Sequence, residues 1–420
     1  MRVYKFGGAS IADADRMAAL LPIVNGEQPL LIVLSALGKT TNALEQIVSL
    51  ACGGKTDAAM TAAHELEQQH LSYAKALLNE VANNEAAIAL QPLFTAFEHA
   101  VQHVAASRYD FSYDQIVCMG ELFSSCIFSF YLHQHSVPCK WVDIRTVIRT
   151  DDTFRDAAVD IIYSAPQAES IIGHALQQGK MVVTQGFIGA TAEGRSVTLG
   201  REGSDYTAAI LAAMLQLGSV TIWKDVKGLQ NADPKLFPNT VKIEAISYSE
   251  VIEMAFYGAQ IIHPKTIKPL QNANIPLYVK CFLDKNLPGS VILADVDHAQ
   301  YPPLIVLKDN QLLIQVTTRD FSFITEDNLS KIYGIFHNLK VKINLIQNAA
   351  ISFIACIDNR EDKVKALIQE LGKDYKVSIN DNVHLLTLRH YTPEILFELT
   401  KEKQILLRQE TRKTIQVVMK

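Results

Sequence analysis

The stretch 198–209, which reads TLGREGSDYTAA, constrains the possible folds more than any other part of the sequence. Upstream of it, the apolar and β-branched run 181–186 predicts a buried strand that ends at a glycine. Downstream, the Ala- and Leu-rich segment 206–217 predicts a helix, with Ser204 or Asp205 as its N-cap. A strand that turns through glycines into a helix is the unit of an α/β fold, so we expect one here.

The same turn has the chemistry of an anion site. Glycine lets backbone N–H groups approach a ligand closely, and the start of a helix adds partial positive charge. Arg201 adds a guanidinium fork that suits a carboxylate or a phosphate. A tight strand-to-helix turn with a surface arginine is the alternative that these residues leave open.

A second unit of this kind opens the chain. Residues 2–6 predict a strand, Gly7 and Gly8 a turn, and residues 13–24 an amphipathic helix. Lys5, on the strand end, could reach a phosphate above the turn and neutralise charge on a transferred phosphoryl group. The Walker-loop spacing is absent, and a double glycine after a strand is also common in ordinary turns.

Polar loops follow two further predicted strands. The strand 30–34 ends in a loop rich in hydroxyls and glycine, at the position where open α/β sheets place ligands. The strand 220–223 ends in the loop 224–235, which carries lysines and aspartates. Glu121, near the start of an apolar helix, could present a carboxylate to a cation. Solvated loops, and a glutamate that favours the helix dipole, remain the alternatives.

Composition bounds the class of protein. With 420 residues and 49% hydrophobic content, the chain can bury at least two cores. A net charge of −5 without a basic run that interleaves with aromatics excludes nucleic acid as an expected partner. Six scattered cysteines without a Cys-x-x-Cys pair indicate reduced thiols and imply neither zinc nor disulfides. We find no 18-residue apolar stretch and no signal peptide, and we expect a cytoplasmic protein without a membrane partner.

The segment 56–107 lacks glycine and favours two or three helices, broken near Pro92. We expect no chemistry in this segment. Its histidines lack cysteines or carboxylates at ligand spacing, and exposed helical positions explain them better; they include His64, His70, His99 and His103.

Beyond a predicted linker at 295–303, the pattern changes. Strands at 312–317, 341–346, 351–356 and 376–379, with helices at 323–339 and 361–371, have the order βαββαβ of a ferredoxin-like unit. Residues 383–419 begin a second copy, which we expect to be truncated before its last helix and strand. The predicted domains are therefore 1–296, 304–380 and 381–420.

Four motifs in this order resemble the aspartate kinase (aspartokinase) family: KFGGAS at 5–10, GREGSD at 200–205, WKDVKG at 223–228 and GAQIIHP at 258–264. The resemblance implies the amino acid kinase fold, an αβα sandwich with a mostly parallel sheet, for 1–296. It implies ACT-type regulatory modules for 304–380 and, in truncated form, 381–420. The implied activity is transfer of the γ-phosphate of ATP to the side-chain carboxylate of L-aspartate. The product, 4-phospho-L-aspartate, leads to lysine, threonine, methionine and diaminopimelate.

The resemblance also implies roles for individual residues. Lys5 and Asp205 would be catalytic, with Lys5 on the transferring phosphoryl group and Asp205 orienting the lysines. Aspartate would be bound by Arg201 and Ser204 at a carboxylate, by Glu121 at the ammonium and by Thr41 beside them. The nucleotide would contact Lys5, Gly7, Gly8, Ser10, Lys224, Asp225, Gln230, Lys235, Gln260 and Ile261. Magnesium would be held mainly by the nucleotide and water, so no protein metal motif is implied.

The sequence departs from the family at several positions. Glu202 stands where the family usually has glycine, which puts a carboxylate beside the expected anion site. Gln230 replaces a usual Tyr, Lys235 a usual Arg and Gln260 a usual Lys. One cation is thereby lost and another exchanged, which puts the affinity for ATP in question. In the first ACT-like module, lysine-inhibited relatives carry an Asp at the position of Asn344 and a Ser-Glu pair at 349–350, where this chain has two alanines. We therefore expect weak or absent lysine inhibition, and a homodimer through the ACT-like modules.

Two alternatives stay open. One is another amino acid kinase, acting on glutamate, acetylglutamate or carbamate. Glu121 argues for a free substrate ammonium and against an acetylated one, and the ACT-like tail argues against carbamate. The other is a catalytically silent amino-acid sensor, supported only by Glu202 and Gln260.

Overall fold

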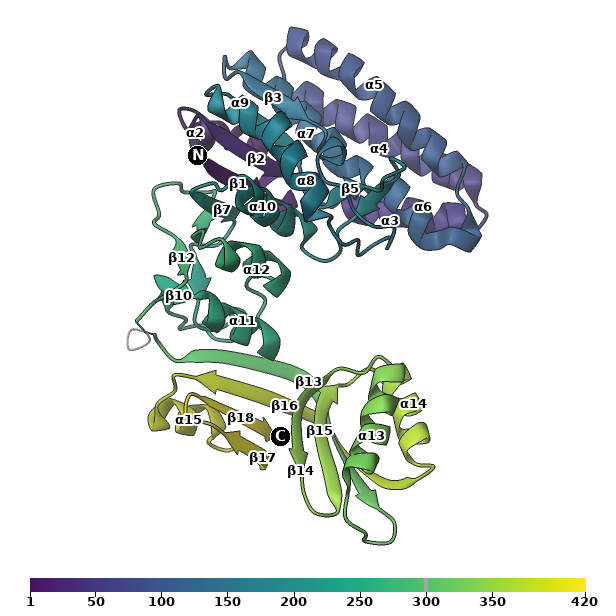
Figure 1. The fold of residues 1–420 in the computed structure, drawn as a ribbon, viewed down its shortest axis with the longest axis vertical. Helices are drawn as coiled ribbons and strands as arrows, with labels where there is room; N and C mark the ends of the chain where they lie inside the picture. Colours follow the sequence, from purple (N-terminus) through teal and green to yellow (C-terminus); the bar gives the residue numbers. More distant parts are fainter. Residues whose placement is uncertain (298–300) are drawn as a thin grey trace. The chain divides into compact units, whose positions relative to one another are not determined.

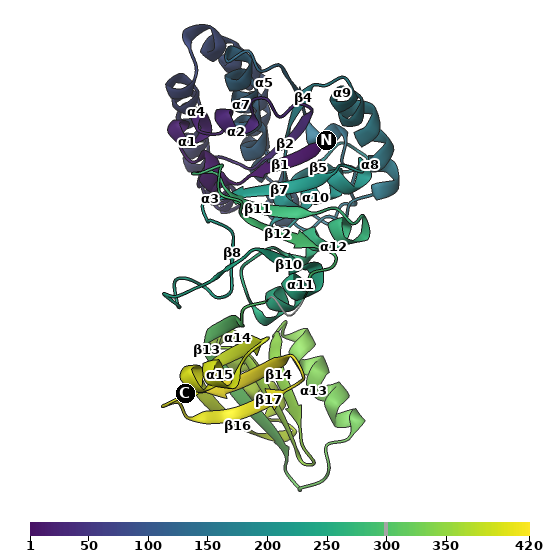
Figure 2. The same ribbon diagram turned by 90° about the vertical axis from the view of Figure 1, so that its left-hand side faces the viewer.

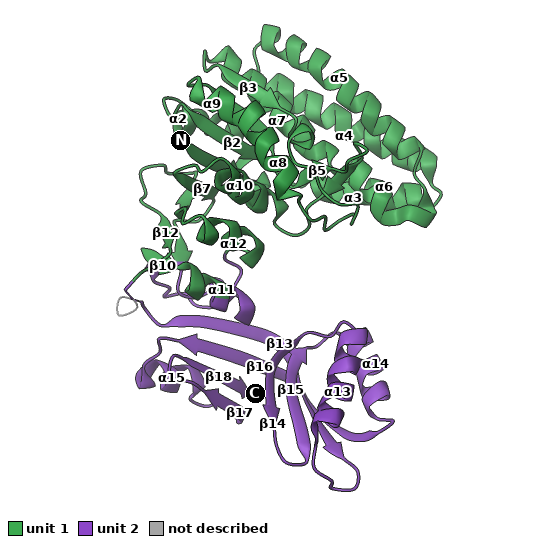
Figure 3. Ribbon diagram, viewed as in Figure 1, with its two compact units in different colours: residues 1–229, 244–252, 262–296 green, residues 230–243, 253–261, 297–420 purple. Residues whose placement is uncertain are grey.

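The computed structural model describes residues 1–297 and 301–420 (Figure 1). These residues form two compact units (Figure 3). Unit 1 contains residues 1–229, 244–252 and 262–296, and unit 2 contains 230–243, 253–261 and 297–420. The boundaries 296, 304 and 380 that the sequence suggests remain predictions. Part of the predicted linker, 298–300, lies outside the described residues.

Unit 1 is built on an eight-stranded sheet with the order β10-β12-β11-β7-β1-β2-β4-β3. Its strands pair in parallel except for β11 with β12. They are β1 (Arg2–Phe6), β2 (Leu30–Leu34), β3 (Cys139–Val142), β4 (Met181–Gln185), β7 (Ser219–Lys224), β10 (Ala245–Ser247), β11 (Leu277–Cys281) and β12 (Ser290–Leu293). Helices cover both faces (Figure 2), so the α/β fold with a mostly parallel sheet is confirmed.

The central strands are buried along their whole length, as parallel strands covered on both faces must be. All residues of β2 and β4 are buried, and both are continuous apolar runs apart from the end of β4. The larger helices around the sheet are α3 (Thr40–Cys52), α4 (Thr56–Leu77), α5 (Glu80–Gln102), α6 (Tyr109–Val117), α7 (Met119–Gln134), α8 (Ile161–Ala168), α10 (Gly203–Met214), α11 (Tyr248–Tyr257) and α12 (Pro264–Asn272).

Two predicted helix boundaries are wrong. Helix α5 continues through Pro92, and the break lies at Leu78 and Asn79, where the Asn79 side chain accepts a hydrogen bond from the Ala82 N–H at 2.9 Å. Pro92 is exposed, so water can satisfy the carbonyl that it leaves free. The expected helix 13–24 is two short helices, α1 (Ala14–Ala18) and α2 (Leu21–Val24), and Pro22 sits at the start of the second.

The helical run Ala106–Gln134 corrects the expectation of no long apolar stretch. By length and composition alone it could cross a membrane, but 89% of its most apolar window is buried inside the protein. Helix α7 packs against β2, β3 and β4. The run is therefore the apolar core helix of unit 1, and its composition reflects burial on nearly every side.

The expectation of exposed histidines is wrong at His70; His64 is exposed as expected, but it does not lack carboxylate neighbours. His70 is fully buried; it hydrogen-bonds the Leu66 carbonyl through Nδ1 at 2.8 Å and packs edge-on against Phe123. Burial lowers the pKa of His70 to about 4, so the ring is neutral. His64 has two carboxylates as neighbours, Glu67 and Glu98. Four of the cysteines are buried, and Cys52 and Cys139 are partly buried.

Unit 2 contains a six-stranded antiparallel sheet with the order β14-β15-β13-β16-β18-β17. Its strands are β13 (Leu304–Thr318), β14 (Ile343–Asn348), β15 (Ser352–Asp358), β16 (Tyr375–Arg389), β17 (Ile405–Glu410) and β18 (Thr414–Met419). Its helices include α13 (Glu326–Asn338), α14 (Glu361–Leu371) and α15 (Pro393–Thr400).

The two central strands of this sheet are longer than expected. Strands β13 and β16 have 15 residues each and pair from Leu304 with Arg389 to Thr318 with Tyr375. Strand β16 therefore runs through the predicted boundary at 380. Separate apolar clusters lie along the two halves, one under α13 and α14 and the other under α15.

Candidate functional site

Five strands of unit 1 end at one edge of the sheet. Residues at or next to their carboxyl ends lie side by side in register, in the order Gln185, Leu34, Phe6, Trp223 and Lys280. The turns that begin at Gly7, Ser35 and Gly186 and the polar loop after Lys224 therefore start at one level. Open α/β sheets place their ligands at this carboxyl edge.

Lys5 and Asp205 meet at this edge. The Lys5 Nζ lies 2.6 Å from the Asp205 Oδ1, and the two side chains are only 11% and 5% exposed. They come from β1 and from the first turn of α10, so the contact brings the two glycine turns together. A buried ion pair costs desolvation energy on both partners, so its presence here favours a functional role.

Glycines allow the turns to come this close. A Cβ on Gly8 would lie 2.9 Å from the carbonyl oxygens of Ala36 and Gly38. A Cβ on Gly186 would lie 2.4 Å from the Ser204 Cβ. Real Cβ atoms do not approach backbone or side-chain atoms at these distances, so any side chain would push the turns apart.

Glu121 reaches the same edge from the first turn of α7. Its Oε1 accepts a hydrogen bond from the Ala36 N–H at 3.2 Å, and its buried Oε2 has no partner in the described chain. Burial raises the pKa of Glu121 to about 8, against the opposing effects of the Ala36 N–H and of the Lys5 charge. A buried carboxylate with a free oxygen is suited to receive a cation.

Serine hydroxyls connect the turns. Ser35 donates to the Ser204 Oγ at 3.0 Å, and Ser124 donates to the Ser35 carbonyl at 2.7 Å. Sequence reasoning did not single out Ser35, Ala36, Ser124 or Gly186. The hydroxyl-rich loop after a buried strand indicates the region of Ser35 and Ala36, but not these two residues individually. Ser124 carried no signal, because it lies inside an apolar helix.

Helix α10 begins differently from the prediction. Its N-cap is Glu202, in the left-handed conformation with φ 54°, and neither Ser204 nor Asp205 caps it. The hydroxyl of Ser204 is engaged by Ser35 and the carboxylate of Asp205 by Lys5, so both are committed elsewhere. The left-handed backbone explains why glycine suits this position.

Glu202 and Arg201 flank the turn on its exposed side. The Glu202 Oε2 accepts a hydrogen bond from the His263 N–H at 2.9 Å, at the start of α12. Arg201 is exposed and pairs with no carboxylate within residues 1–297 and 301–420. Behind them, buried Asp114 accepts hydrogen bonds from the N–H and hydroxyl of Thr198, at 2.9 and 2.7 Å. The turn is therefore held from within and leaves a guanidinium available.

The remaining predicted residues are distributed over both units. Ser10 donates to the Trp223 carbonyl at 3.3 Å, which ties the first turn to β7, and Lys224 and Asp225 follow directly. Thr41 is half-buried in the first turn of α3. The other four nucleotide residues belong to unit 2, and their place beside the nucleotide stays a prediction: Gln230, Lys235, Gln260 and Ile261.

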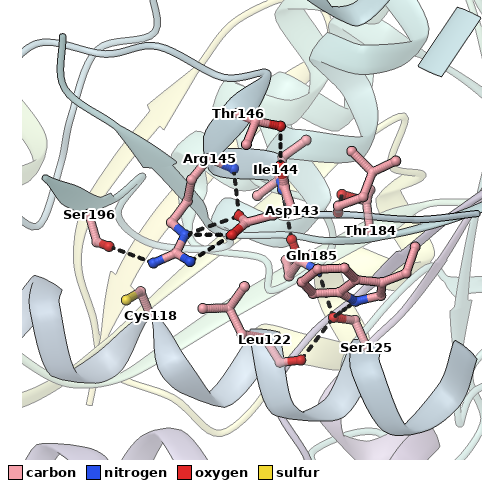
Figure 4. Close-up of polar contacts among 12 residues, drawn as sticks. Cys118, Leu122, Ser125, Asp143, Ile144, Arg145, Thr146, Thr184, Gln185 and Ser196 are labelled. Atoms are coloured by element: carbon pink, nitrogen blue, oxygen red, sulfur yellow. Dashed lines mark hydrogen bonds and ion pairs between the residues drawn. The ribbon is translucent and has the colours of Figure 1, made fainter. Parts of the chain in front are cut away.

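A polar network supports the ends of β3 and β4 (Figure 4). Gln185 accepts from the Ile144 N–H at 2.8 Å and donates to the Ser125 hydroxyl at 2.7 Å. Arg145 binds the Asp143 carboxylate at 2.6 Å and donates to the Ser196 hydroxyl at 3.1 Å. The single amide in the apolar strand 181–185 is therefore a structural group that holds the loop after β3.

The fold and the carboxyl-edge site are those of an amino acid kinase, and residues 1–281 match the model of the amino acid kinase family. Lysine-sensitive aspartokinase 3 of Escherichia coli is 30% identical over 409 residues, which cover 92% of this chain and 86% of that protein. The structure of E. coli aspartokinase III with lysine and aspartate has a TM-score of 0.82 at 27% identity and covers 100% of this chain and 95% of that chain. The same enzyme with aspartate and ADP has a TM-score of 0.79 at 28% identity, covering 100% and 96%. The chain belongs to the aspartokinases.

Proposed function

We propose that the chain transfers the γ-phosphate of ATP to the side-chain carboxylate of L-aspartate and gives 4-phospho-L-aspartate and ADP. The observation that carries the proposal is the meeting of Lys5 and Asp205 at the carboxyl edge, with the free oxygen of Glu121 at the same edge. Membership of the aspartokinases supports it, and so do the aspartate and ADP bound to the E. coli relative.

The charges at the edge complement L-aspartate, which has one ammonium and two carboxylates. We assign the ammonium to Glu121, because its Oε2 is buried and has no donor in the described chain. We assign a carboxylate to Arg201 and Ser204, with Thr41 completing the pocket. A guanidinium without a carboxylate partner is suited to bind one in a bidentate manner.

The reaction needs charge stabilisation more than proton transfer. A carboxylate oxygen of aspartate attacks the γ-phosphorus, and the bond from the γ-phosphorus to the bridging oxygen of ADP breaks. The nucleophile is already ionised at neutral pH, so no general base is required. Lys5 and the Gly7–Gly8 backbone would stabilise the charge on the transferring group, and Asp205 would orient Lys5.

For the nucleotide we propose Ser10, Lys224 and Asp225 from unit 1. From unit 2 we propose Gln230, Lys235, Gln260 and Ile261. Magnesium would accompany ATP, held mainly by phosphate oxygens and water; it would neutralise phosphate charge during transfer.

We propose that lysine inhibits this chain weakly or not at all, in contrast to the lysine-sensitive relative. The hydrogen-bonding groups of Asn344 are already engaged: its Nδ2 donates to Gln311 at 2.7 Å and to Asp358 at 2.9 Å, and its Oδ1 accepts from Lys308 at 2.9 Å. The ammonium of Lys308 thus occupies the polar cluster that an effector ammonium would need. Half-inhibition at micromolar lysine would contradict this proposal.

We also propose a cytoplasmic homodimer that pairs through unit 2. Strands β14 and β17 are the two edges of its sheet, and an edge strand presents unpaired backbone groups to a second copy. Light scattering after size exclusion should give twice the chain mass. A monomer at micromolar concentration would overturn this part of the proposal.

One assay separates the proposed activity from its alternatives. The protein is incubated with MgATP and single amino acids, and hydroxylamine traps any acyl phosphate. We expect hydroxamate with L-aspartate. A signal with glutamate instead would identify a glutamate-type kinase, and no signal with any amino acid would favour the silent sensor.

A further inference from the structure

Three side chains outside the carboxyl edge form a separate cluster in unit 1. His64 and Glu67 lie one turn apart on α4, and Glu98 lies on α5, which packs against α4 (Figures 1 and 2). One ligand atom from each lies within 4.8 Å of the other two. The His64 Nε2 is 3.0 Å from the Glu98 Oε1.

Glu67 is the unusual member of this cluster. The residue is 6% exposed, and its buried Oε1 accepts no hydrogen bond within the described residues. An ion pair between His64 and Glu98 would account for two of the groups, but it leaves the buried Glu67 oxygen without a partner. A bound cation would supply that partner.

We propose that His64, Glu67 and Glu98 bind a divalent transition-metal ion of the Zn²⁺ type and thereby link α4 to α5. Imidazole nitrogen with carboxylate oxygens suits Zn²⁺ and its neighbours, whereas Mg²⁺ prefers oxygen ligands alone. Three protein ligands leave a coordination position for water. The site is separate from the Lys5–Asp205 edge, so its role is to hold the two long helices together.

The geometry requires little rearrangement. Bonds of about 2.0–2.2 Å to a tetrahedral ion would place ligand atoms roughly 3.3 Å apart, close to the present His64–Glu98 distance. Rotation of the Glu67 side chain would bring its oxygen to the same centre. His64 also lines an open surface hollow with Thr61 and Gln68, so an ion can enter from solvent.

The test is zinc binding by the full chain after chelator treatment and without nucleotide. Titration against a chromophoric chelator should show one Zn²⁺ per chain at this site. The variants H64N and E67Q should each weaken it on the order of 10-fold or more, because each removes a ligand. Zinc should raise the Tm of the wild type and not that of H64N, since binding to the native state stabilises it. His64 is exposed, so H64N carries little risk to folding.

Controls distinguish this site from rival chelates. E65Q changes an exposed carboxylate on the same helix and should bind like the wild type. H99N removes the alternative His99–His103 pair at the C-terminal end of α5, and C139S removes the thiol 3.5 Å from His133. If H99N or C139S abolishes binding while E67Q does not, the metal lies elsewhere and the proposal is wrong. Absence of binding at 100 μM Zn²⁺, on the order of ten times the protein concentration in such a titration, would also overturn the proposal. So would displacement of the zinc by an equal concentration of Mg²⁺.

Discussion

Each unit contains a lysine paired with an aspartate: Lys5 with Asp205 in unit 1, and Lys308 with Asp358 in unit 2. The two pairs differ in how many hydrogen-bonding groups remain available to a ligand. In the described chain, Asp205 is the one partner of Lys5, at 2.6 Å. Lys308 instead contacts Asp358 at 3.3 Å and Asn344 at 2.9 Å, and Asp358 accepts further hydrogen bonds from Gln311 and Asn344.

An ammonium has three donors and Lys5 makes one ion-pair contact, so at least two donors remain for a ligand. The Lys308 cluster satisfies its members internally and is partly open to water, with the Asp358 side chain 41% exposed. The comparison teaches that a lysine–aspartate pair indicates a functional site only when its neighbours leave it unsatisfied. The first pair should therefore control activity and the second only stability.

The largest expected effect is the loss of activity in Lys5→Met. Removing the cation that stabilises the transferring phosphoryl group should lower kcat by about 10³-fold. The matched variant Lys308→Met should keep kcat within about twofold and lower the free energy of unfolding by about 1 kcal/mol, because its partners are already hydrogen-bonded to amides. Release of ADP measures the first effect and urea unfolding the second. Equal losses of activity in both variants would remove the distinction.

Glu121→Gln should raise the KM for aspartate roughly 10-fold or more and leave the KM for ATP unchanged. The variant keeps the shape of the side chain but loses the charge that we assign to the substrate ammonium, a charge-assisted hydrogen bond of about 1.5–3 kcal/mol. Initial rates at saturating ATP measure it. A decrease in kcat alone would contradict the assignment and favour a structural role.

The raised pKa of Glu121 predicts a pH dependence. In the free protein Glu121 is protonated below pH about 8, and only the ionised form suits an ammonium. The kcat/KM for aspartate should therefore rise towards pH 8 and flatten in Glu121→Gln. The folded state also holds a proton that the unfolded chain releases above its ordinary pKa near 4.5, so unfolding free energy should fall as pH rises from 4.5 to 8. A wild-type profile as flat as that of the variant would rule out this pKa.

Packing at a glycine should differ between the two units as well. Gly186→Ala would force a Cβ to within 2.4 Å of the Ser204 Cβ and should cost about 1–3 kcal/mol of stability together with much of the activity. Gly334→Ala, in helix α13 of unit 2, meets nothing within 4 Å and should stabilise the protein by about 0.5–1 kcal/mol. Thermal unfolding and initial rates measure both. A neutral Gly186→Ala would show that the turns can separate without consequence.

The smallest expected effect concerns the charge beside Arg201. Glu202→Gln removes a carboxylate near the proposed anion site and should lower the KM for aspartate by about twofold, with a larger effect at low salt. Glu202→Gly should do the same and also relieve the left-handed backbone, at the loss of the hydrogen bond to the His263 N–H. If only the glycine variant changes KM, backbone strain is responsible and charge is not.

The strand–glycine–helix units could be predicted from sequence, because glycine turns and apolar periodicity are local properties. That basis predicts the two turns at Gly7–Gly8 and 200–205 and indicates Lys5 and Glu121 as candidates, whereas the role of Asp205 is implied by the family resemblance. The sequence predicts the wrong N-cap for α10, because Ser204 and Asp205 are residue types that often cap helices. Their side chains are instead engaged by Ser35 and Lys5 from other strands.

The sequence by itself therefore determined the fold class, the family and the chemistry of the loops at the strand ends. Only the tertiary structure decided that Lys5 and Asp205 lie 2.6 Å apart, that Glu121 loses its ordinary pKa and that His70 is buried. It also decided that His64 and Glu67 face Glu98, whose position lies 34 residues away from His64. These properties depend on burial and on distances between remote segments, which no local pattern encodes.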